Sequence, residues 1–139
     1  MKFKLIKGEI EEFAIIEDKI PEDLDNIIVK CGIIAKINPN EKIIAIYNTV
    51  RFCIGIKDLL KIKSVLYFKI HADTWDSLIF EEEIILKKTQ VQHFGIITIG
   101  ATRGMLIAKT NNTPYSSMLL PPLNINDIIN EDIKFLKNQ

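Results

Sequence analysis

The fold is decided by residues 27–52, which read IIVKCGIIAKINPNEKIIAIYNTVRF. Two runs rich in β-branched residues, Ile27 to Ile37 and Lys42 to Ile56, flank Asn38-Pro39-Asn40-Glu41, whose residue types favour a tight connection. Because side chains alternate between the faces of a strand, placing Ile37 opposite Lys42 gathers apolar residues on one face. The resulting cross-strand pairs are Ile33 with Ile46, Val29 with Val50, and Ile27 with Phe52. We therefore expect an antiparallel hairpin with one apolar face.

Shorter patterns on both sides of this hairpin predict further strands. Residues Lys2 to Ile16 alternate well enough for one extended strand with a bulge near Gly8. Ser64 to His71 predicts another strand, and one of its faces would carry Leu66, Phe68 and Ile70. The stretches expected to connect strands are Glu17 to Asn26 and Lys57 to Lys63.

Two later stretches each fit more than one structure. Phe94 to Gly104 has the β-branched residues and glycines of a hairpin, whereas an apolar stripe along Thr89 to Thr110 fits a helix. The stripe recurs at three- and four-residue spacing and consists of Val91, Phe94, Thr98, Ala101, Met105 and Ala108. Glu81 to Lys88 fits either the end of a strand or the beginning of a helix. Periodicity leaves both questions open.

The last residues of the chain predict a helix. Pro121-Pro122 keeps the preceding stretch extended, and Asn124 or Asn126 can cap the first turn. Asp127 suits the positive N-terminal end of a helix. The apolar stripe of this helix would be formed by Ile125, Ile128, Ile129, Ile133 and Leu136.

Length and charge limit the classes of function. The chain has 139 residues, with 18 Lys and Arg against 18 Asp and Glu. This length fits a single domain over residues 1–139, and zero net charge argues against generic nucleic-acid binding. The N-terminal residues lack the continuous apolar segment of a signal peptide, and no apolar run approaches the roughly 18 residues that span a bilayer. We expect a cytoplasmic protein that does not insert into membranes.

No arrangement of reactive residues matches a known catalytic or metal motif. Cys31 and Cys53 lack the short spacing of zinc ligands, and we expect them to be small apolar residues on opposite faces of the hairpin. His71 and His93 have no nearby nucleophile arrangement, so structural or surface roles are expected. A small enzyme that uses His71 with Asp73 or Asp76 is the rival hypothesis. We expect no enzyme activity, no cofactor and no metal site.

Arg103 stands out because the residues around it carry no charge. A lone arginine in such a setting requires a carboxylate or several carbonyl oxygens as partners. We expect a structural ion pair inside the chain or at a subunit interface, and Glu81-Glu82-Glu83 could provide the carboxylates.

The C-terminal third resembles the protein-export chaperone SecB and stand-alone SecB-like proteins. From Ala101 the chain reads ATRGMLIAKT, then a short polar turn that ends in Thr113-Pro114-Tyr115, then LLPPLNIN. Arg103 corresponds to an arginine near the middle of the long SecB helix, and Pro122, Asn124 and Ile125 match the segment that opens the last helix. The resemblance implies that Thr89 to Thr110 is a helix, with Gly104 and Ala108 as close-packing positions.

The family implies an α+β fold: a four-stranded antiparallel sheet with a long helix and a C-terminal helix, assembled as a dimer of dimers. It also implies an ATP-independent chaperone that holds unfolded or extended polypeptide in apolar grooves. By topology, the groove residues would be Phe13, Pro21, Phe52, Phe68, Trp75, Leu119 and Leu120. SecB is strongly acidic whereas this chain is neutral, so a role in protein transport does not follow. The alternative is a regulatory partner-binding module, for example one associated with a toxin–antitoxin locus.

Overall fold

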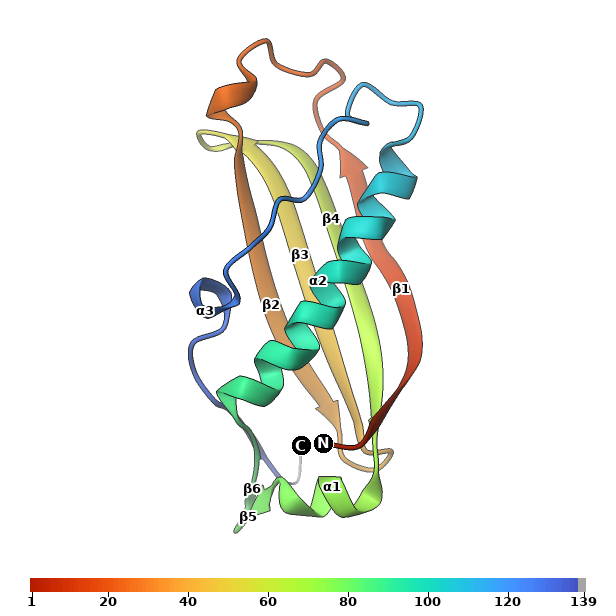
Figure 1. The fold of residues 1–139 in the computed structure, drawn as a ribbon, viewed down its shortest axis with the longest axis vertical. Helices are drawn as coiled ribbons and strands as arrows, with labels where there is room; N and C mark the ends of the chain where they lie inside the picture. Colours follow the sequence, from red (N-terminus) through yellow and green to blue (C-terminus); the bar gives the residue numbers. More distant parts are fainter. Residues whose placement is uncertain (138–139) are drawn as a thin grey trace.

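Four long strands form one antiparallel sheet in the order β1-β4-β3-β2 (Figure 1). They are β1 (Phe3–Ile15), β2 (Ile28–Asn38), β3 (Ile43–Ile54) and β4 (Lys57–Ile70). The computed structural model describes residues 1–137. The sheet, together with the helices that lie against it, confirms the expected α+β class with a four-stranded antiparallel sheet.

The hairpin of β2 and β3 has the expected apolar face but a different register. Ile37 pairs with Ile44 instead of Lys42, so the strands are shifted by two residues. A two-residue shift keeps every side chain on its face, because the alternation has a period of two. The connection runs from Pro39 to Lys42, since Asn38 pairs with Ile43. Lys42 adopts φ 56° there, a left-handed conformation that sequence patterns rarely predict for lysine.

The stretch Lys57 to Lys63, expected as a connection, is the first half of β4. Ile54 pairs with Lys57, so only Gly55 and Ile56 form the turn, and Gly55 supplies the positive φ of 58°. Leu59, Leu60 and Ile62 of this stretch are buried in the core. Its lysines meet acids of β1: Lys61 contacts Glu12 and Lys63 contacts Glu11. Strand β1 has register irregularities after Leu5 and after Ile10, on either side of Gly8.

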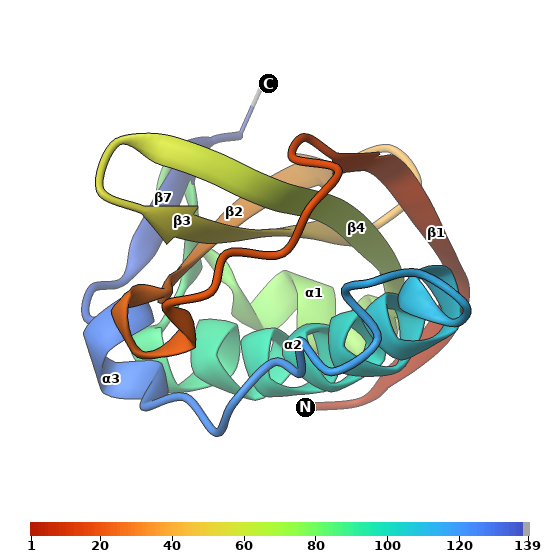
Figure 2. The same cartoon turned by 90° about the horizontal axis from the view of Figure 1, so that it is seen from above.

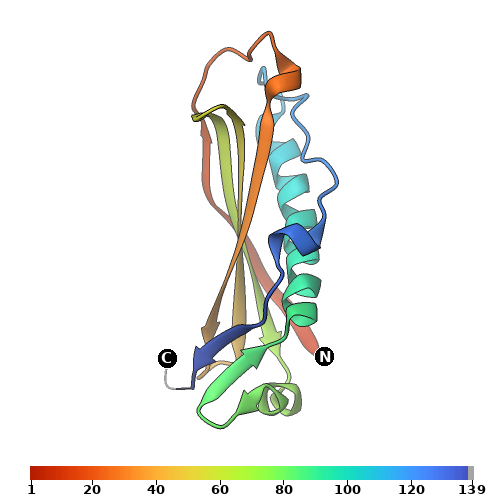
Figure 3. The same cartoon turned by 90° about the vertical axis from the view of Figure 1, so that its left-hand side faces the viewer.

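Helix α2 (Lys88–Thr110) crosses one face of the sheet, which resolves the ambiguous stretch in favour of helix. Figure 3 shows α2, the segment that follows it (residues 111–124) and α3 (Ile125–Ile128) on this inner face, with the other face uncovered. Two bonds secure the beginning of the helix: Lys87 N donates to Gln90 Oε1 over 2.9 Å, and Lys88 N donates to Asp132 Oδ1 over 2.7 Å.

A buried polar row lies between two apolar clusters of the core. One cluster surrounds Phe68 and Phe94, and the other surrounds Phe52 and Tyr115. Between them Asn48 pairs across the strands with Ser64, and Ser64 Oγ lies 2.6 Å from Thr102 Oγ1 of α2. All three side chains are fully buried. We call Asn48, Ser64 and Thr102 the polar row.

The C-terminal helix is much shorter than expected. Helix α3 spans only Ile125–Ile128, and Asn124 caps it by accepting a hydrogen bond from Asn126 N over 3.1 Å. The chain then forms β7 (Ile133–Leu136), which pairs with β6 (Glu83–Leu86), and β6 pairs with β5 (Ile79–Phe80). The prediction that the helix continues through Ile133 and Leu136 was therefore wrong. Ile133 and Phe135 alternate with exposed Lys134 and pack on the core as strand residues. The short helix α1 (Ala72–Ser77) lies beside this small sheet (Figure 1).

Candidate functional site

Exposed apolar side chains gather where β1 ends and β2 begins. The loop between these strands contains η1 (Leu24–Asn26) and passes over this end of the sheet (Figures 1 and 2). Beneath it lies the core cluster of Phe52 and Tyr115, onto which the loop packs Ile20. Three apolar residues between the end of β1 and the start of β2 stay in solvent, with exposed fractions of 49% for Ile16, 51% for Leu24 and 55% for Ile28. Leu119, from the segment between α2 and α3, is 57% exposed. We call Ile16, Leu24, Ile28 and Leu119 the apolar end.

The crossover between α2 and α3, residues 111–124, is fastened at two points and carries Leu119 between them. Tyr115 is fully buried, and its hydroxyl donates to Glu17 O over 2.8 Å, which joins the crossover to the loop after β1. Burial, and then the nearby Glu17 and Asp18 carboxylates, raise the pKa of Tyr115 above its ordinary value. Further along, Arg103 Nε donates to Leu120 O over 3.0 Å, and its Nη2 donates to Pro121 O over 3.0 Å.

Arg103 therefore bonds to backbone carbonyls, and its expected glutamate partners lie elsewhere. Glu81 and Glu82 belong to the turn between β5 and β6, and Glu83 begins β6. The arginine also faces a groove of about 200 Å³ between α2 and the crossover, which Pro122 and Leu123 line. Its role within the chain is to hold the crossover against the helix.

Strand β2 is an edge of the sheet and pairs only with β3 among residues 1–137. A cleft of about 390 Å³ runs along it, lined by residues that include Gly32, Ile34 and Arg51. Gly32 exposes its backbone, since a Cβ added to it would meet nothing within 4 Å, and Ile34 is 60% exposed. An unpaired edge strand offers backbone donors and acceptors to any extended chain that approaches it. The cleft begins next to Ile28 of the apolar end.

The residues expected to line a groove are only partly brought together. Phe13 and Pro21 are half-buried at the apolar end, and Leu119 is exposed there. Phe52 and Leu120 lie beneath them at 2% and 3% exposure, where they support the surface instead of forming it. The remaining two expected residues, Phe68 and Trp75, are buried in the other core cluster, away from this end. Binding by any of these residues stays a prediction.

The outer side of α2 is uncovered within the chain. Gly104 has nothing within 4 Å of an added Cβ, and Ala108 is exposed. Ile96 and Ile107 are exposed on the same helix at 56% and 45%. The interface role of Gly104 and Ala108 stays a prediction, because it concerns contacts between chains.

The two cysteines occupy opposite faces, as the alternation predicted, and both are free. Cys31 Sγ accepts a hydrogen bond from Asn48 over 3.1 Å, and Cys53 Sγ donates to Asp58 Oδ1 over 3.0 Å. Burial raises the pKa of both thiols; at Cys31 the Asn48 hydrogen bond opposes this, whereas at Cys53 the Asp58 hydrogen bond adds to it. Raised pKa values keep thiols protonated, which is unfavourable for nucleophilic attack.

The histidines have structural contacts. His71 caps α1, since its Nδ1 accepts from Asp73 N over 3.3 Å, and Asp73 Oδ2 lies 3.9 Å from the same nitrogen. The His93 ring lies against Phe3 and Phe94, with centroids 5.8 and 6.2 Å apart. Residues 1–137 contain no group of three or more His, Cys, Asp or Glu that could hold a metal ion. None of the helices formed by these residues combines the length and apolarity needed to cross a membrane.

Sequence reasoning missed the exposed residues Ile16, Leu24 and Ile28 and the edge position of β2. Strand order follows from long-range pairing, which periodicity does not report. One signal was present in the sequence: Ile34 alternates with Lys30 and Lys36 on the face of the hairpin opposite the apolar one, where an apolar residue has no intrachain reason to be.

Comparison with known proteins supports the fold. No protein-family model matches the chain, and no curated protein matches it in sequence. Among solved structures, it is similar to a Mycobacterium tuberculosis SecB-like chaperone, solved in complex with a ChAD peptide from the HigA1 antitoxin. The identity is 10% and the TM-score 0.50, over 88% of this chain and 87% of that one. The likeness concerns the fold, which is SecB-like.

Proposed function

We propose that the protein is an ATP-independent, SecB-like binding protein that holds extended or non-native polypeptide segments. The observation that carries this proposal is the apolar end, where four large apolar side chains are about half exposed at one end of the molecule, next to a well-packed core cluster and the free edge of β2. Exposed apolar patches of this kind mark interaction sites. The proposal includes no enzymatic step and no cofactor.

The two parts of the site supply different interactions. The apolar end buries side chains of the client, which provides affinity without a fixed sequence. The β2 edge provides backbone hydrogen bonds, which every extended chain can match, and the bare backbone of Gly32 allows close approach. Lys30 and Lys36 flank this stretch as exposed charges that discourage open-ended strand pairing. Both interactions suit an unfolded segment better than a folded surface.

A fluorescence titration with a permanently unfolded, reduced and carboxymethylated reporter protein tests the proposal. The Leu24→Ser/Leu119→Ser variant removes two side chains that are 51% and 57% exposed, so folding should be nearly unaffected. Full burial of a leucine contributes about 1.5–3 kcal/mol, so about 1 kcal/mol per half-exposed side chain predicts binding weaker by about 30-fold. Leu136→Ser is the matched control, since Leu136 is 59% exposed at the other end of the molecule.

The contribution of the β2 edge can be separated from that of the apolar end. A client peptide with alternate backbone amides N-methylated keeps its side chains but cannot pair along one edge. We expect it to bind more weakly than the unmodified peptide. The proposal fails if no unfolded reporter binds, or if Leu136→Ser and Leu24→Ser/Leu119→Ser weaken binding equally.

A regulatory module with one dedicated partner is the alternative, and the similar chaperone was solved with a peptide from an antitoxin. The two functions predict different selectivity. A chaperone binds several unrelated unfolded reporters with affinities within about tenfold, whereas a dedicated module binds one segment far more tightly. Titrating the same preparation with several reporters distinguishes them.

Assembly into a homotetramer belongs to the same proposal. The uncovered side of α2, with Ile96, Ile107 and the small residues Gly104 and Ala108, fits a helix that packs against a second copy. Sedimentation of the protein at micromolar concentration should then show tetramers, and Ile107→Ser should shift them toward smaller species. A monomer at all concentrations would contradict this part. A cytoplasmic location is likewise proposed, and fractionation of cells tests it.

A further inference from the structure

Four lysines converge at the end of the sheet opposite the apolar end. Lys2, Lys4, Lys42 and Lys69 line a hollow of about 460 Å³, which Phe3 and Ile70 also border. They come from three separate elements: the beginning of β1, the turn between β2 and β3, and the end of β4. We call Lys2, Lys4, Lys42 and Lys69 the basic corner.

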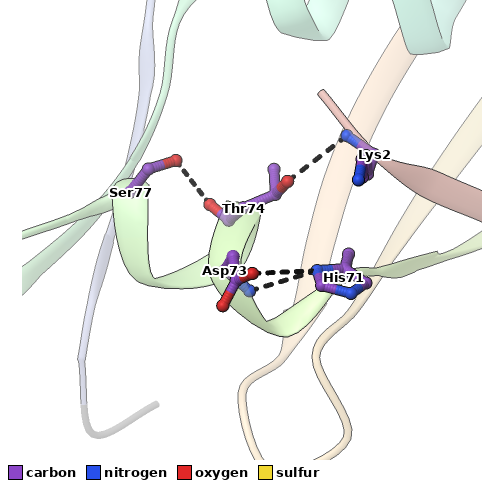
Figure 4. Close-up of polar contacts among 5 residues, drawn as sticks. All are labelled: Lys2, His71, Asp73, Thr74 and Ser77. Atoms are coloured by element: carbon purple, nitrogen blue, oxygen red, sulfur yellow. Dashed lines mark hydrogen bonds and ion pairs between the residues drawn. The ribbon is translucent and has the colours of Figure 1, made fainter.

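Hydrogen bonds that involve backbone groups hold these elements together. Ile70 N donates to Lys42 O over 2.9 Å, and Lys69 Nζ donates to the carbonyl of Glu41, which keeps the Lys69 ammonium beside the turn. On the other side of the hollow, His71 N donates to Lys2 O over 3.0 Å. Figure 4 shows how Lys2 is also fastened to α1, where its backbone N donates to Thr74 Oγ1 over 3.3 Å. The basic corner is therefore built by the fold and is not a chance meeting of flexible ends.

The charges of the basic corner are not neutralised within the described residues. Lys7, Lys57, Lys61 and Lys63 each lie within 3.4 Å of a glutamate oxygen, whereas no lysine of the basic corner has an ion-pair partner in residues 1–137. Lys4 also pairs directly with Lys69 across β1 and β4. Like charges opposite each other destabilise a sheet, so this pair works against folding unless an anion lies nearby.

The nearby acids do not fill the hollow. Glu41 stands on the turn next to Lys42, but only its carbonyl contacts a lysine. Asp73 lies on α1, 94% exposed, and its carboxylate faces His71. No carboxylate of residues 1–137 lines the hollow, in which the His71 ring adds a further polar group beside the four ammonium groups.

We propose that the basic corner binds an acidic segment of a partner polypeptide. Several carboxylates on one short chain match several ammonium groups spread around a hollow. Nucleic acid is disfavoured, because the corner is a single small hollow without arginine and without a row of aromatic rings for stacking bases. This inference does not rest on the proposed function, since strands of 13 and 14 residues separate the two ends by about 40 Å.

Fluorescence anisotropy of a labelled hexaglutamate peptide tests the inference with the full chain. We expect binding at about 50 mM salt that weakens as salt rises, because ions screen exposed charges. The Lys4→Gln/Lys69→Gln variant should bind about three- to tenfold more weakly, since each exposed charge contributes modestly. The matched control Lys61→Gln/Lys63→Gln removes the same charge from the same sheet and should bind like the original protein.

Thermal unfolding shows whether weaker binding by the Lys4→Gln/Lys69→Gln variant results from a loss of the folded state. The Lys4→Gln/Lys69→Gln variant should melt at about the same temperature, because it removes a like-charge pair and also the exposed bond from Lys69 Nζ to Glu41 O. Equal weakening by both double variants, or no binding of hexaglutamate, overturns the inference. Tighter binding of a single-stranded oligonucleotide than of hexaglutamate would assign the corner to nucleic acid and overturn it too. Displacement of the peptide by an equal concentration of inorganic phosphate would likewise overturn it, by reducing the corner to a small-anion site.

Discussion

Replacing Arg103 by methionine should loosen the crossover while the sheet stays folded. The guanidinium donates over 3.0 Å to Leu120 O and over 3.0 Å to Pro121 O. Leu120 is 3% exposed, so the loss of a charged donor there costs about 1.5 kcal/mol, and the solvent-exposed bond to Pro121 adds about 0.5 kcal/mol. We therefore expect the free energy of unfolding to fall by about 2 kcal/mol. An unfolding entropy of about 2.1 cal/mol/K for each of 139 residues converts this to about 7 °C in Tm.

Circular dichroism melts and limited proteolysis measure the two aspects of this prediction. Chymotrypsin should cut after exposed Leu119 faster in Arg103→Met than in the original protein, at temperatures far below Tm. Arg103→Lys should lose about half as much stability, because one ammonium group cannot hold two carbonyls in a fixed fork. The only other arginine, Arg51, is exposed on β3 and provides the control: Arg51→Met should stay within about 0.5 kcal/mol.

The result that refutes this reasoning is an Arg103→Met protein that melts like Arg51→Met and resists chymotrypsin like the original. Tyr115 alone would then hold the crossover, through its bond to Glu17 O. A full loss of the folded state would also contradict the reasoning, since the sheet and its two core clusters do not depend on the guanidinium.

Three further predictions concern a buried pair of hydroxyl groups, a glycine on the uncovered side of α2 and a tyrosine of β4. Thr102→Val should cost about 1–2 kcal/mol by leaving the buried Ser64 hydroxyl without its 2.6 Å partner, and adding Ser64→Ala should restore part of this loss in urea titrations. Gly104→Ala should raise the free energy of unfolding by about 0.5–1 kcal/mol, because alanine favours the helix and its methyl group meets nothing within 4 Å. If Gly104 packs against a second copy, the same change should weaken assembly, as sedimentation would measure. Burial and the hydrogen bond to Glu9 raise the pKa of Tyr67 to about 12. The unfolded state therefore loses this proton first, and stability should fall between about pH 10 and pH 12 more in the original protein than in Tyr67→Phe, as urea titrations at several pH values would show.

The sheet was predictable from local patterns because the alternation of apolar and polar residues indicates which face of each strand is buried. Parity placed Ile33, Val50 and Phe52 on the correct face, and a two-residue slip left that result intact. The slip itself could not be detected, because every even shift satisfies the same alternation. The observed register goes with a turn over residues 39–42 in which Lys42 is left-handed, and hydrophobic patterns do not encode backbone conformations of this kind.

The C-terminal stripe was misleading because the isoleucines of this chain fit two periods at once. Ile125, Ile129 and Ile133 recur every four residues, which predicts a helix, whereas Ile133 and Phe135 alternate as in a strand. Long-range contacts decide between them: β6 offers an edge that pairs with residues 133–136, and Asp132 is required at the first turn of α2. The longer α2 was ambiguous as well, and its assignment as a helix followed from the resemblance to SecB.

The sequence did not show which apolar residues would form the surface of the candidate site. The loop after β1 and the crossover do meet at the apolar end, as the resemblance implied. Aromatic residues were the natural choice for a binding groove, yet large rings also fill cores, and Phe52, Phe68 and Trp75 do so here. Burial depends on which elements cover a residue, and that information lies in the tertiary arrangement.

The zero net charge of the chain conceals a separation of charge along the sheet. The loop over the apolar end carries four exposed acids, Asp18, Glu22, Asp23 and Asp25, against one exposed lysine, Lys19, while the basic corner lies at the far end of the strands. Between the two, glutamates of β1 neutralise Lys61 and Lys63. Fields of opposite sign about 40 Å apart are independent, because this distance exceeds a Debye length of about 8 Å several times over. We therefore expect basic flanks on a client to favour the apolar end and acidic segments to favour the basic corner, so that each end selects its own partner without competition from the other.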